Sequence, residues 1–363
     1  MAERVVFLIV GKKIIGLIYR FRFAIIAITV ALSLWLRPQV ADINVKYNEA
    51  RMLMGTTVSI DVCQSYYDLE NIIQVYAEVW ERLEEIAWRM NVYDARSEVT
   101  LINNAQGATV TIQEDTYQLL KRSKYAYQQT HQTFDITVRP LIDFWKEKSD
   151  EGVMPSEEEL QEILPFIGAE NIRLLKNNQV QLNNPHTRID LGGNAKGYAI
   201  DEAVRIFKKH DIERVFVDAG GDVFVSGASC QNTDWRVGVR DSKELNRIAL
   251  VVKGQNIAVT TSGNYEQYVV IGDKKFSHII DPRTGMPQEN VASATVIGPS
   301  AEVADVLSTA LTVLDPEEGV ALIDRLGEGY ASLTVVMNAQ AEVLRYESKN
   351  LKSYLVQINN LKE

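Results

Sequence analysis

The sequence predicts an α+β fold, with a mixed or antiparallel β core and flanking helices, preceded by an N-terminal hydrophobic segment. Beyond residue 185 the chain becomes rich in glycine turns and short β-runs, which is typical of local hairpins. Between about residues 68 and 90, apolar residues recur at spacings of three and four, which predicts a long helix with one buried face. The elements lack the regular strand–helix alternation of a doubly wound sheet, so the α+β class is favoured.

The first half of the body contains most of the other expected helices. Alternation and β-branching predict a strand at 52–62. Helices are expected at 115–129 and 156–163, and the second begins with a capping box in which Ser156 is followed by Glu159. These helices are interpreted as scaffold.

The second half supplies most of the expected strands. Short β-branched runs beside glycine predict strands at 214–218, 223–225, 235–240, 248–252, 257–260 and 294–297. Two helices at 301–313 and 317–325 then precede closing strands at 333–337 and 341–346. Length alone allows one or two domains, but the sequence shows no repeat and no long linker, so residues 41–363 are expected to form one domain.

Residues 1–40 have the layout of a signal peptide or a membrane anchor. Lys12, Lys13, Arg20 and Arg22 precede an uncharged apolar run at 23–36. The run is shorter than the ~20 residues that cross a bilayer without tilt, which suits a cleaved signal. No clear small-x-small cleavage site follows it, however, so an anchor is slightly favoured. We expect export to the extracytoplasmic face of the inner membrane.

Charge and cysteine content exclude several classes of protein. Residues 1–40 hold six basic residues and one acidic residue, whereas the rest of the chain holds 32 basic and 47 acidic residues. An acidic body without a basic stripe is repelled by a phosphate backbone, so nucleic-acid binding is not expected. Cys63 and Cys230 are the two cysteines, which excludes zinc ribbons and disulfide scaffolds; a single bridge between them remains open.

Three segments contain residue types suited to phosphate chemistry. A glycine pair at 192–193 opens a helix, where free backbone amides and Lys196 favour anions. Asp305 and Thr309 lie four residues apart on one helix face and are hard oxygen donors suited to Mg²⁺. His278 stands between a strand and a polar turn, where its imidazole can accept a hydroxyl proton. Taken singly, each segment also has a structural interpretation. The glycine pair fits a plain strand-turn-helix, the Asp305–Thr309 pair is better explained as a dipole-stabilised acid and a satisfied hydroxyl, and His278 fits an ordinary strand residue.

Read in order, the segments resemble the ApbE family of FAD:protein FMN transferases. The resemblance covers roughly residues 47–345. It rests on eight motifs: Met54-Gly55-Thr56, Met90-Asn91-Val92-Tyr93 with Ser97-Glu98, Phe134-Asp135-Ile136-Thr137, residues 190–201, Gly220-Gly221-Asp222, Ser262-Gly263-Asn264-Tyr265, residues 277–285 and residues 304–309. The fold that this implies is ApbE-like and T-fold-like.

The resemblance also implies roles for individual residues. FAD is expected to contact Met54, Tyr93, Thr133, Phe134, Asp135, Asp190, Lys196, Asp201, Ser262, Gly263 and Ile280. The magnesium ligands are expected to be the Gly193 carbonyl, Asp305 and Thr309, and His278 is expected to activate the acceptor hydroxyl. Two departures from the family pattern, Arg139 in place of glycine and Asn194 in place of an aliphatic residue, leave the fine shape of the flavin pocket open.

The implied reaction is Mg²⁺-dependent transfer of FMN from FAD to a Thr or Ser hydroxyl of an acceptor protein, with release of AMP. The implied partner is a redox subunit of a membrane electron-transport complex. Two alternatives remain open from the residues: an FAD pyrophosphatase that yields FMN and AMP, and a non-catalytic FAD-binding module. The second is disfavoured because a storage protein needs no hydroxyl-activating base.

Overall fold

The computed structural model describes residues 28, 31, 32, 44–65, 69–244, 246–264, 268–338, 340 and 342–356. The expected signal or anchor segment falls almost entirely outside these residues, as does Tyr265. Within the described part of the chain, no helix has both the length and the apolar character needed to cross a bilayer.

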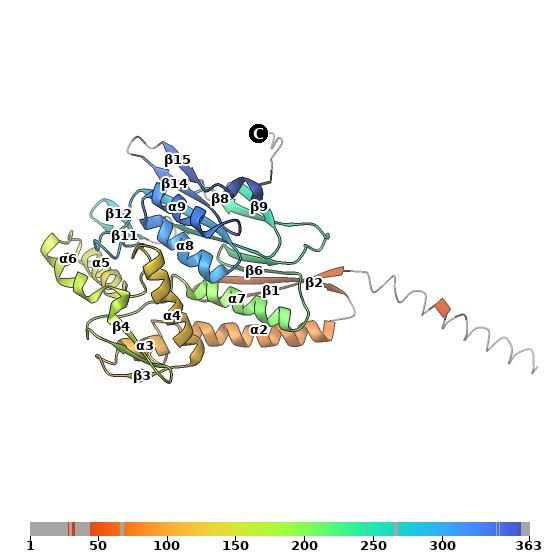
Figure 1. Ribbon diagram of the computed structural model, residues 1–363, viewed down its shortest axis with the longest axis horizontal. Helices are drawn as coiled ribbons and strands as arrows, with labels where there is room; N and C mark the ends of the chain where they lie inside the picture. Colours follow the sequence, from red (N-terminus) through yellow and green to blue (C-terminus); the bar gives the residue numbers. More distant parts are fainter. Residues whose placement is uncertain are drawn as a thin grey trace, which may run out of the picture.

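An eight-stranded sheet forms the centre of the molecule (Figure 1), in the order β1-β2-β6-β7-β10-β13-β14-β15 with every neighbouring pair antiparallel. Its strands are β1 (Asn44–Leu53), β2 (Thr56–Ser65), β6 (Val215–Ala219), β7 (Asp222–Ser226), β10 (Ile257–Gly263), β13 (Val291–Gly298), β14 (Ala331–Met337) and β15 (Val343–Glu347). Most of them are joined to a sequence neighbour by a hairpin, which agrees with the glycine-rich pattern. The predicted α+β class with antiparallel sheets is confirmed.

Helices cover one face of this sheet (Figure 1) because their apolar stripes match its buried side chains. These helices are α2 (Leu69–Arg89), α7 (Ala195–Lys209) and α8 (Ala301–Val313), with α4 (Glu114–Gln129) packed beside them. The stripe predicted at 68–90 is the buried face of α2, with Trp80 1% exposed. The capping box at Ser156 and Glu159 is also present, at the start of α6 (Glu157–Ile163).

The opposite face is covered by a β-ribbon of β8 (Trp235–Arg240) and β9 (Ile248–Gly254), together with α10 (Leu351–Tyr354). The remaining small elements are α3 (Glu98–Asn103), α9 (Pro316–Leu326), β3 (Val110–Thr111), β4 (Ile172–Leu175) and β5 (Gln179–Leu182), with 3₁₀ turns at Leu164–Phe166 and Ala169–Asn171. A disulfide joins Cys63 in β2 to Cys230 in the loop before β8. The bridge that the sequence left open is therefore formed in the structure.

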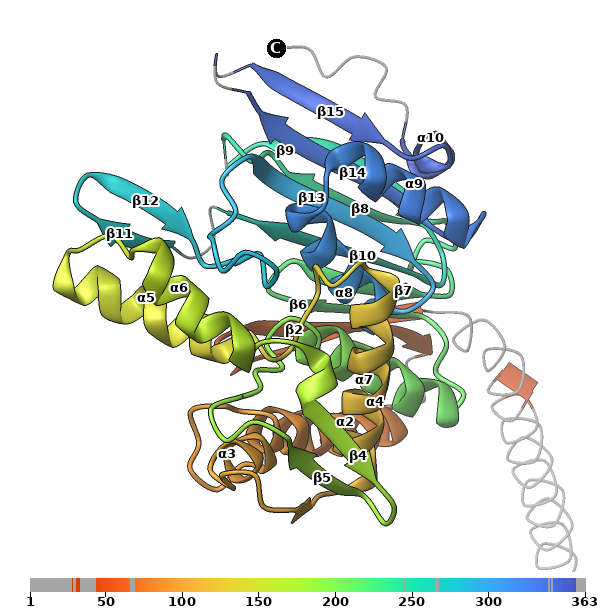
Figure 2. The ribbon, with the colours of Figure 1, turned by 60° about the vertical axis from the view of Figure 1, so that its left-hand side comes forward.

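A separate lobe lies at one end of the sheet. It consists of α5 (Arg139–Glu151), α6 and a hairpin of β11 (Tyr268–Ile271) and β12 (Lys274–Ser277). These elements share a small apolar cluster centred on Trp145 and Phe276. Figure 2 shows the hairpin beside α5, away from the central strands. The lobe matters for function because the chain leaving β12 leads directly to His278.

Candidate functional site

A cavity of about 990 Å³ lies where the β1–β2 turn, the end of α2, the start of α7, the middle of α8 and the segment after β12 meet. Thirteen of the predicted site residues line it: Met54, Tyr93, Phe134, Asp135, Asp190, Gly193, Lys196, Ser262, Gly263, His278, Ile280, Asp305 and Thr309. They come from segments spread along more than 250 residues of sequence. The glycine turn, the Asp305–Thr309 pair and the His278 imidazole thus share one cavity.

A close contact between α7 and α8 brings Asp305 to the cavity. A β-carbon at Gly197 would lie 2.4 Å from the Ala301 carbonyl oxygen, so glycine is required for this approach. The Gly197 N–H, in the first turn of α7, donates to Asp305 Oδ2 at 3.1 Å. A carboxylate at the positive end of a helix is stabilised by the helix dipole. The contact therefore holds one buried negative charge at the base of the cavity.

The glycine turn before α7 is also close-packed, though less tightly than Gly197. A β-carbon at Gly193 would lie 3.1 Å from the Phe134 ring and 3.9 Å from Thr309 Oγ1. The Phe134 ring is therefore the tight contact, whereas the Thr309 hydroxyl lies at ordinary van der Waals distance from that position. Beside it, Ser262 Oγ lies 3.3 Å from Thr309 Oγ1 and 2.9 Å from Ser308 Oγ.

Lys196 reaches the cavity from the first turn of α7. Its ammonium group is paired with Asp222 Oδ2, and Asp222 Oδ1 accepts a hydrogen bond from the Thr261 N–H at 3.1 Å. Asp222 is 2% exposed, so this carboxylate is a buried anchor that ties the lysine to β10. The sequence motif contained Asp222, but nothing in the sequence linked it to Lys196.

Asp135 contributes a carboxylate with one incompletely satisfied oxygen. Its Oδ1 accepts hydrogen bonds from the Thr137 N–H and hydroxyl at 2.8 and 2.7 Å. Its Oδ2 is buried and has no hydrogen-bond partner among the described residues. Burial raises the pKa of Asp135 to about 6, although the Thr137 hydrogen bonds act in the opposite direction. A buried oxygen without a partner costs free energy unless a ligand supplies a donor.

Tyr93 borders the cavity mouth and is stacked under a guanidinium group. The Arg139 Cζ lies 4.8 Å from the centre of the Tyr93 ring. Arg139 also donates to Asp190 Oδ2 at 3.3 Å and pairs with Asp143 at 2.8 Å. The arginine that departs from the family pattern therefore orders two cavity residues. The other departure, Asn194, points away from the cavity and donates to Ser123 Oγ at 2.8 Å.

His278 occupies the segment between β12 and a rigid turn. The Ile279 N–H donates to Ser277 Oγ at 3.1 Å, which fixes the end of the strand. The following turn is closed by the Gly285 N–H, which donates to the Asp281 carbonyl at 2.8 Å. Neighbouring packing thus holds the imidazole-bearing segment against the cavity.

Two residues that were predicted to contact FAD do not line the cavity. Asp201 is not among the cavity-lining residues; its carboxylate accepts the Ser300 hydroxyl at 2.7 Å and the N–H groups of Ala301 and Glu302 at 2.8 and 3.0 Å. It therefore caps the N-terminus of α8, and burial raises its pKa. Thr133 is also absent from the lining, because it is buried and its hydroxyl donates to the Thr130 carbonyl at 2.7 Å.

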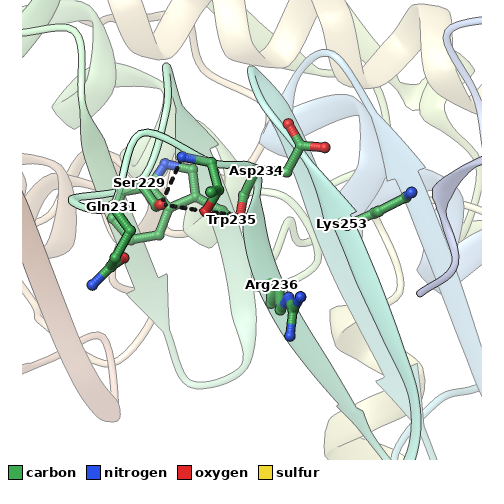
Figure 3. A pocket seen from close by; sticks show the side chains of 7 residues that line it. Ser229, Gln231, Asp234, Trp235, Arg236 and Lys253 are labelled. Carbon is green, nitrogen blue, oxygen red and sulfur yellow. Dashed lines mark hydrogen bonds between the residues drawn. The ribbon is translucent and has the colours of Figure 1, made fainter. Parts of the chain in front are cut away.

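A second hollow, of about 460 Å³, lies on the outer ribbon of β8 and β9. Figure 3 shows Arg236 and Lys253 on neighbouring strands beside it, with Asp234 and Trp235 at its edge. It contains none of the predicted site residues. The chemistry predicted from the sequence therefore belongs to the larger cavity.

Comparison with known proteins identifies the family to which this architecture belongs. The ApbE family model matches residues 54–334. The chain belongs to the ApbE family. A curated ApbE-family relative from Vibrio cholerae, named FAD:protein FMN transferase, is 27% identical over 307 residues, covering 83% of this chain and 90% of its own. A relative of the same name from Escherichia coli K12 is 27% identical over 301 residues, covering 81% and 85%.

Solved structures of the ApbE family agree with the fold. The ApbE protein of Thermotoga maritima superposes with a TM-score of 0.77 at 32% identity, over 86% of this chain and 100% of its own. The flavin transferase ApbE from Vibrio cholerae superposes with a TM-score of 0.74 at 26% identity, again over 86% and 100%. The resemblance read from the sequence motifs is confirmed.

Proposed function

We propose that this chain transfers FMN from FAD to a Thr or Ser hydroxyl of an acceptor protein, forming a phosphoester bond and releasing AMP. The names of its curated relatives support the activity. The observation that carries the proposal is that Lys196, Gly193, Asp305, Thr309 and His278 line one cavity. This combination provides phosphate binding, hard oxygen ligands and a base in a single space.

In the proposed reaction, the acceptor hydroxyl oxygen attacks the FMN phosphorus while the bond from that phosphorus to the AMP oxygen breaks. His278 takes the hydroxyl proton, which contributes the ~10²–10⁴-fold typical of general-base catalysis. Lys196 and the amides at the start of α7 face the pyrophosphate and stabilise the charge that develops on it. The buried Asp222 keeps the lysine directed from α7.

The donor set at the base of the cavity fits Mg²⁺. Asp305 would supply a carboxylate oxygen, Thr309 a hydroxyl and residue 193 a backbone carbonyl, and the turn at Gly193 lies beside Thr309. Mg²⁺ prefers such hard oxygens and completes its shell with water and substrate phosphate. When bound, the ion would neutralise charge on the pyrophosphate. No group of three or more His, Cys, Asp or Glu residues suited to a metal occurs in the described chain, so a phosphate-assisted site fits better than an all-protein cage.

The rest of the cavity suits the flavin. Met54 lies in a left-handed conformation, with φ of 51°, at the tip of the β1–β2 hairpin, and Tyr93 and Ile280 present further apolar surface. The Oδ2 of Asp135 is buried and lacks a donor among the described residues, so it can accept a ligand N–H or O–H once the side chain turns toward the cavity that Asp135 lines. Asp190, Ser262 and Gly263 complete the polar lining.

The test is an assay of the full chain with FAD and MgCl₂, with and without a panel of domains from membrane electron-transport subunits. Flavin fluorescence that stays with a denatured acceptor band, together with equimolar AMP, indicates transfer. Free FMN without labelled acceptor would instead indicate the pyrophosphatase, and unchanged FAD would indicate a binding module.

A histidine pair provides the matched variants for this assay. His278→Ala should lower the transfer rate by ~10²-fold or more, because the base is lost. His210→Ala removes an imidazole that pairs with Glu78 at 2.7 Å outside the cavity, and transfer should stay within about twofold of wild type. Equal rates in the two variants would contradict the assigned base.

We further propose that the enzyme acts at the extracytoplasmic face of the inner membrane, held there by residues 1–40. The basic and then apolar order of that segment supports export. The Cys63–Cys230 disulfide supports it independently, because such bonds persist in oxidising compartments. Protease digestion of intact spheroplasts should degrade the body of the chain, whereas protection equal to that of a cytoplasmic marker would refute this location.

A further inference from the structure

The β11–β12 hairpin has one buried face and one exposed face. Ile271 and Phe276 pack into the apolar cluster of α5 and α6. Tyr268 and Val270 are 50% and 43% exposed on the other face, and Lys275 Nζ lies 4.3 Å from the centre of the Tyr268 ring. The hairpin is thus anchored on one side and accessible on the other.

The two edges of the hairpin differ in their hydrogen bonding. On β11, the Val270 N–H donates to Ser149 Oγ at 3.3 Å, and the Ser149 hydroxyl donates to the Val270 carbonyl at 2.8 Å. Helix α5 therefore caps this edge at Val270, as Figure 2 indicates by the position of β11 beside α5. A capped edge cannot accept another strand.

The edge of β12 is open at the corresponding position. Lys275 pairs with Val270 across the hairpin. Because the main-chain groups of Val270 point outward to Ser149, this is a non-hydrogen-bonded pair, and the N–H and C=O of Lys275 must also point outward. Among the described residues, no backbone or side-chain group bonds to them. Ser277, the next residue on this edge, is the last residue of β12.

The chain of this edge continues into the cavity, with the edge accessible at Lys275 and buried at Ser277. His278 follows Ser277 directly, and His278, Ile279 and Ile280 all line the cavity. An added strand advances by roughly 3.3 Å per residue, so a segment paired with Lys275 reaches the His278 region within about three residues. Main-chain pairing at Lys275 would place an extended segment of another protein beside His278, where the hydroxyl that receives FMN has to bind.

We propose that the outer edge of β12 is the docking strand for the acceptor protein. An extended segment of the acceptor adds to this edge through main-chain hydrogen bonds at Lys275, which brings its Thr or Ser hydroxyl to His278. The proposal rests on the proposed transferase function and names how its protein substrate is held. Recognition through the main chain leaves the acceptor side chains around the hydroxyl free to enter the cavity.

The test compares Lys275→Pro with Lys275→Ala in the full chain, using as probe the domain that takes up FMN from the wild-type protein. Proline removes an N–H that the hairpin ladder does not use, whereas alanine removes the side chain and keeps that N–H. Lys275→Pro should raise the KM for the acceptor by about fivefold to tenfold, as expected for a lost main-chain hydrogen bond. Lys275→Ala should stay within about twofold of wild type, and both variants should bind FAD as wild type does.

Amide hydrogen exchange of the wild-type chain supplies a second readout that needs no variant. Adding the acceptor should slow exchange at Lys275 and Ser277. A wild-type KM for the acceptor in both variants, or unchanged amide exchange, would overturn the docking proposal while leaving the transferase intact. Equal loss in both variants would assign binding to the lysine side chain, and self-association abolished by Lys275→Pro would assign the edge to a second copy; either result overturns the proposal. Absence of any transfer by the wild type would remove the proposed function itself.

Discussion

Two regions of the molecule place charged groups in partly buried surroundings, and they differ in how those groups are partnered. Between α2, α4 and α7, the scaffold charge cluster consists of Arg82, Glu85, Arg89, Asp115 and Glu202. Arg82 alone contacts three carboxylates, at 2.6, 2.6 and 3.0 Å. In the cavity, by contrast, Asp135 Oδ2 has no partner among the described residues, and its pKa is raised to about 6.

The difference separates charges that hold the fold from charges available to a ligand. In the scaffold charge cluster, hydrogen bonds and neighbouring arginines lower the pKa of Asp115 even though burial acts to raise it. Asp201 belongs with this group despite its proximity in sequence to the glycine turn, since three donors at the start of α8 satisfy it. Incomplete satisfaction in a cavity is a better indicator of function than burial alone.

The largest effect is expected from Asp305→Asn. The change removes the charge expected to hold Mg²⁺ but keeps the side-chain size and an acceptor for the Gly197 N–H. Transfer should fall by ~10³-fold with little change in melting temperature, because charge stabilisation in the transition state is lost. Steady-state rates and thermal melts check this, and activity within tenfold of wild type would place the metal elsewhere.

Removing a charge from the scaffold charge cluster should lower the stability of the fold and leave the transfer rate unchanged. Arg89, with its side chain 9% exposed, pairs with Asp115 at 2.6 Å, and Arg89→Met leaves the half-buried Asp115 with Arg82 as its remaining partner among the described arginines. The free energy of unfolding should fall by about 3 kcal/mol, with transfer per folded molecule unchanged.

Urea unfolding measures this loss, and Arg96→Met is the matched control. Arg96 also pairs with an aspartate, at 3.0 Å, but its side chain is 78% exposed. Its loss should therefore leave the urea midpoint nearly unchanged. Equal effects of the two substitutions would erase the distinction between buried and exposed pairs.

A pH-dependent effect on stability, no larger than that of Arg89→Met, is expected from Asp135→Asn. Because burial raises the pKa of Asp135 to about 6 from an ordinary 3.8, the folded chain holds a proton that the unfolded chain releases. The stabilisation is complete below about pH 4 and is lost as pH rises through 6, so the variant, which does not titrate, should gain up to about 3 kcal/mol relative to wild type between pH 4 and 7.5.

Chemical unfolding of both proteins across that pH range, with FAD titrations alongside, tests this effect. The variant should bind FAD more weakly, because one of the two acceptor oxygens of the carboxylate is replaced by an NH₂ group, which donates hydrogen bonds. A stability difference that does not vary with pH would show that Asp135 is not held protonated by its surroundings.

The local sequence patterns predicted much of the fold because they follow burial. The apolar stripe of α2 appears because one face of that helix is buried, whereas α8 is buried on most of its surface and its Asp305 and Thr309 face the cavity. The strand expected at 52–62 covers most of β2 but only the last two residues of β1. The rest of β1 was not predicted, because its described side chains are half-buried or exposed and it lacks apolar alternation. Helix α5 was missed for a similar reason, since Leu141 and Trp145 are its only fully buried residues.

The contacts within the site could not be predicted from the spacing of residues in the sequence. Gly197 and Asp201 lie four apart on α7, so both face whatever helix packs there, and the sequence does not say that this is α8. Once α8 is placed, Asp201 caps its first turn and Asp305 receives the Gly197 N–H. The motif order indicated the correct family, but the partner of each carboxylate follows only from the packing of the two helices.

The most direct measurement is a crystal structure of the full chain with FAD and Mg²⁺. The account predicts the flavin beside Tyr93, the pyrophosphate against residues 192–193, and a metal bound to Asp305 and Thr309. FAD bound in the hollow on β8 and β9, or a metal held without Asp305, would contradict it.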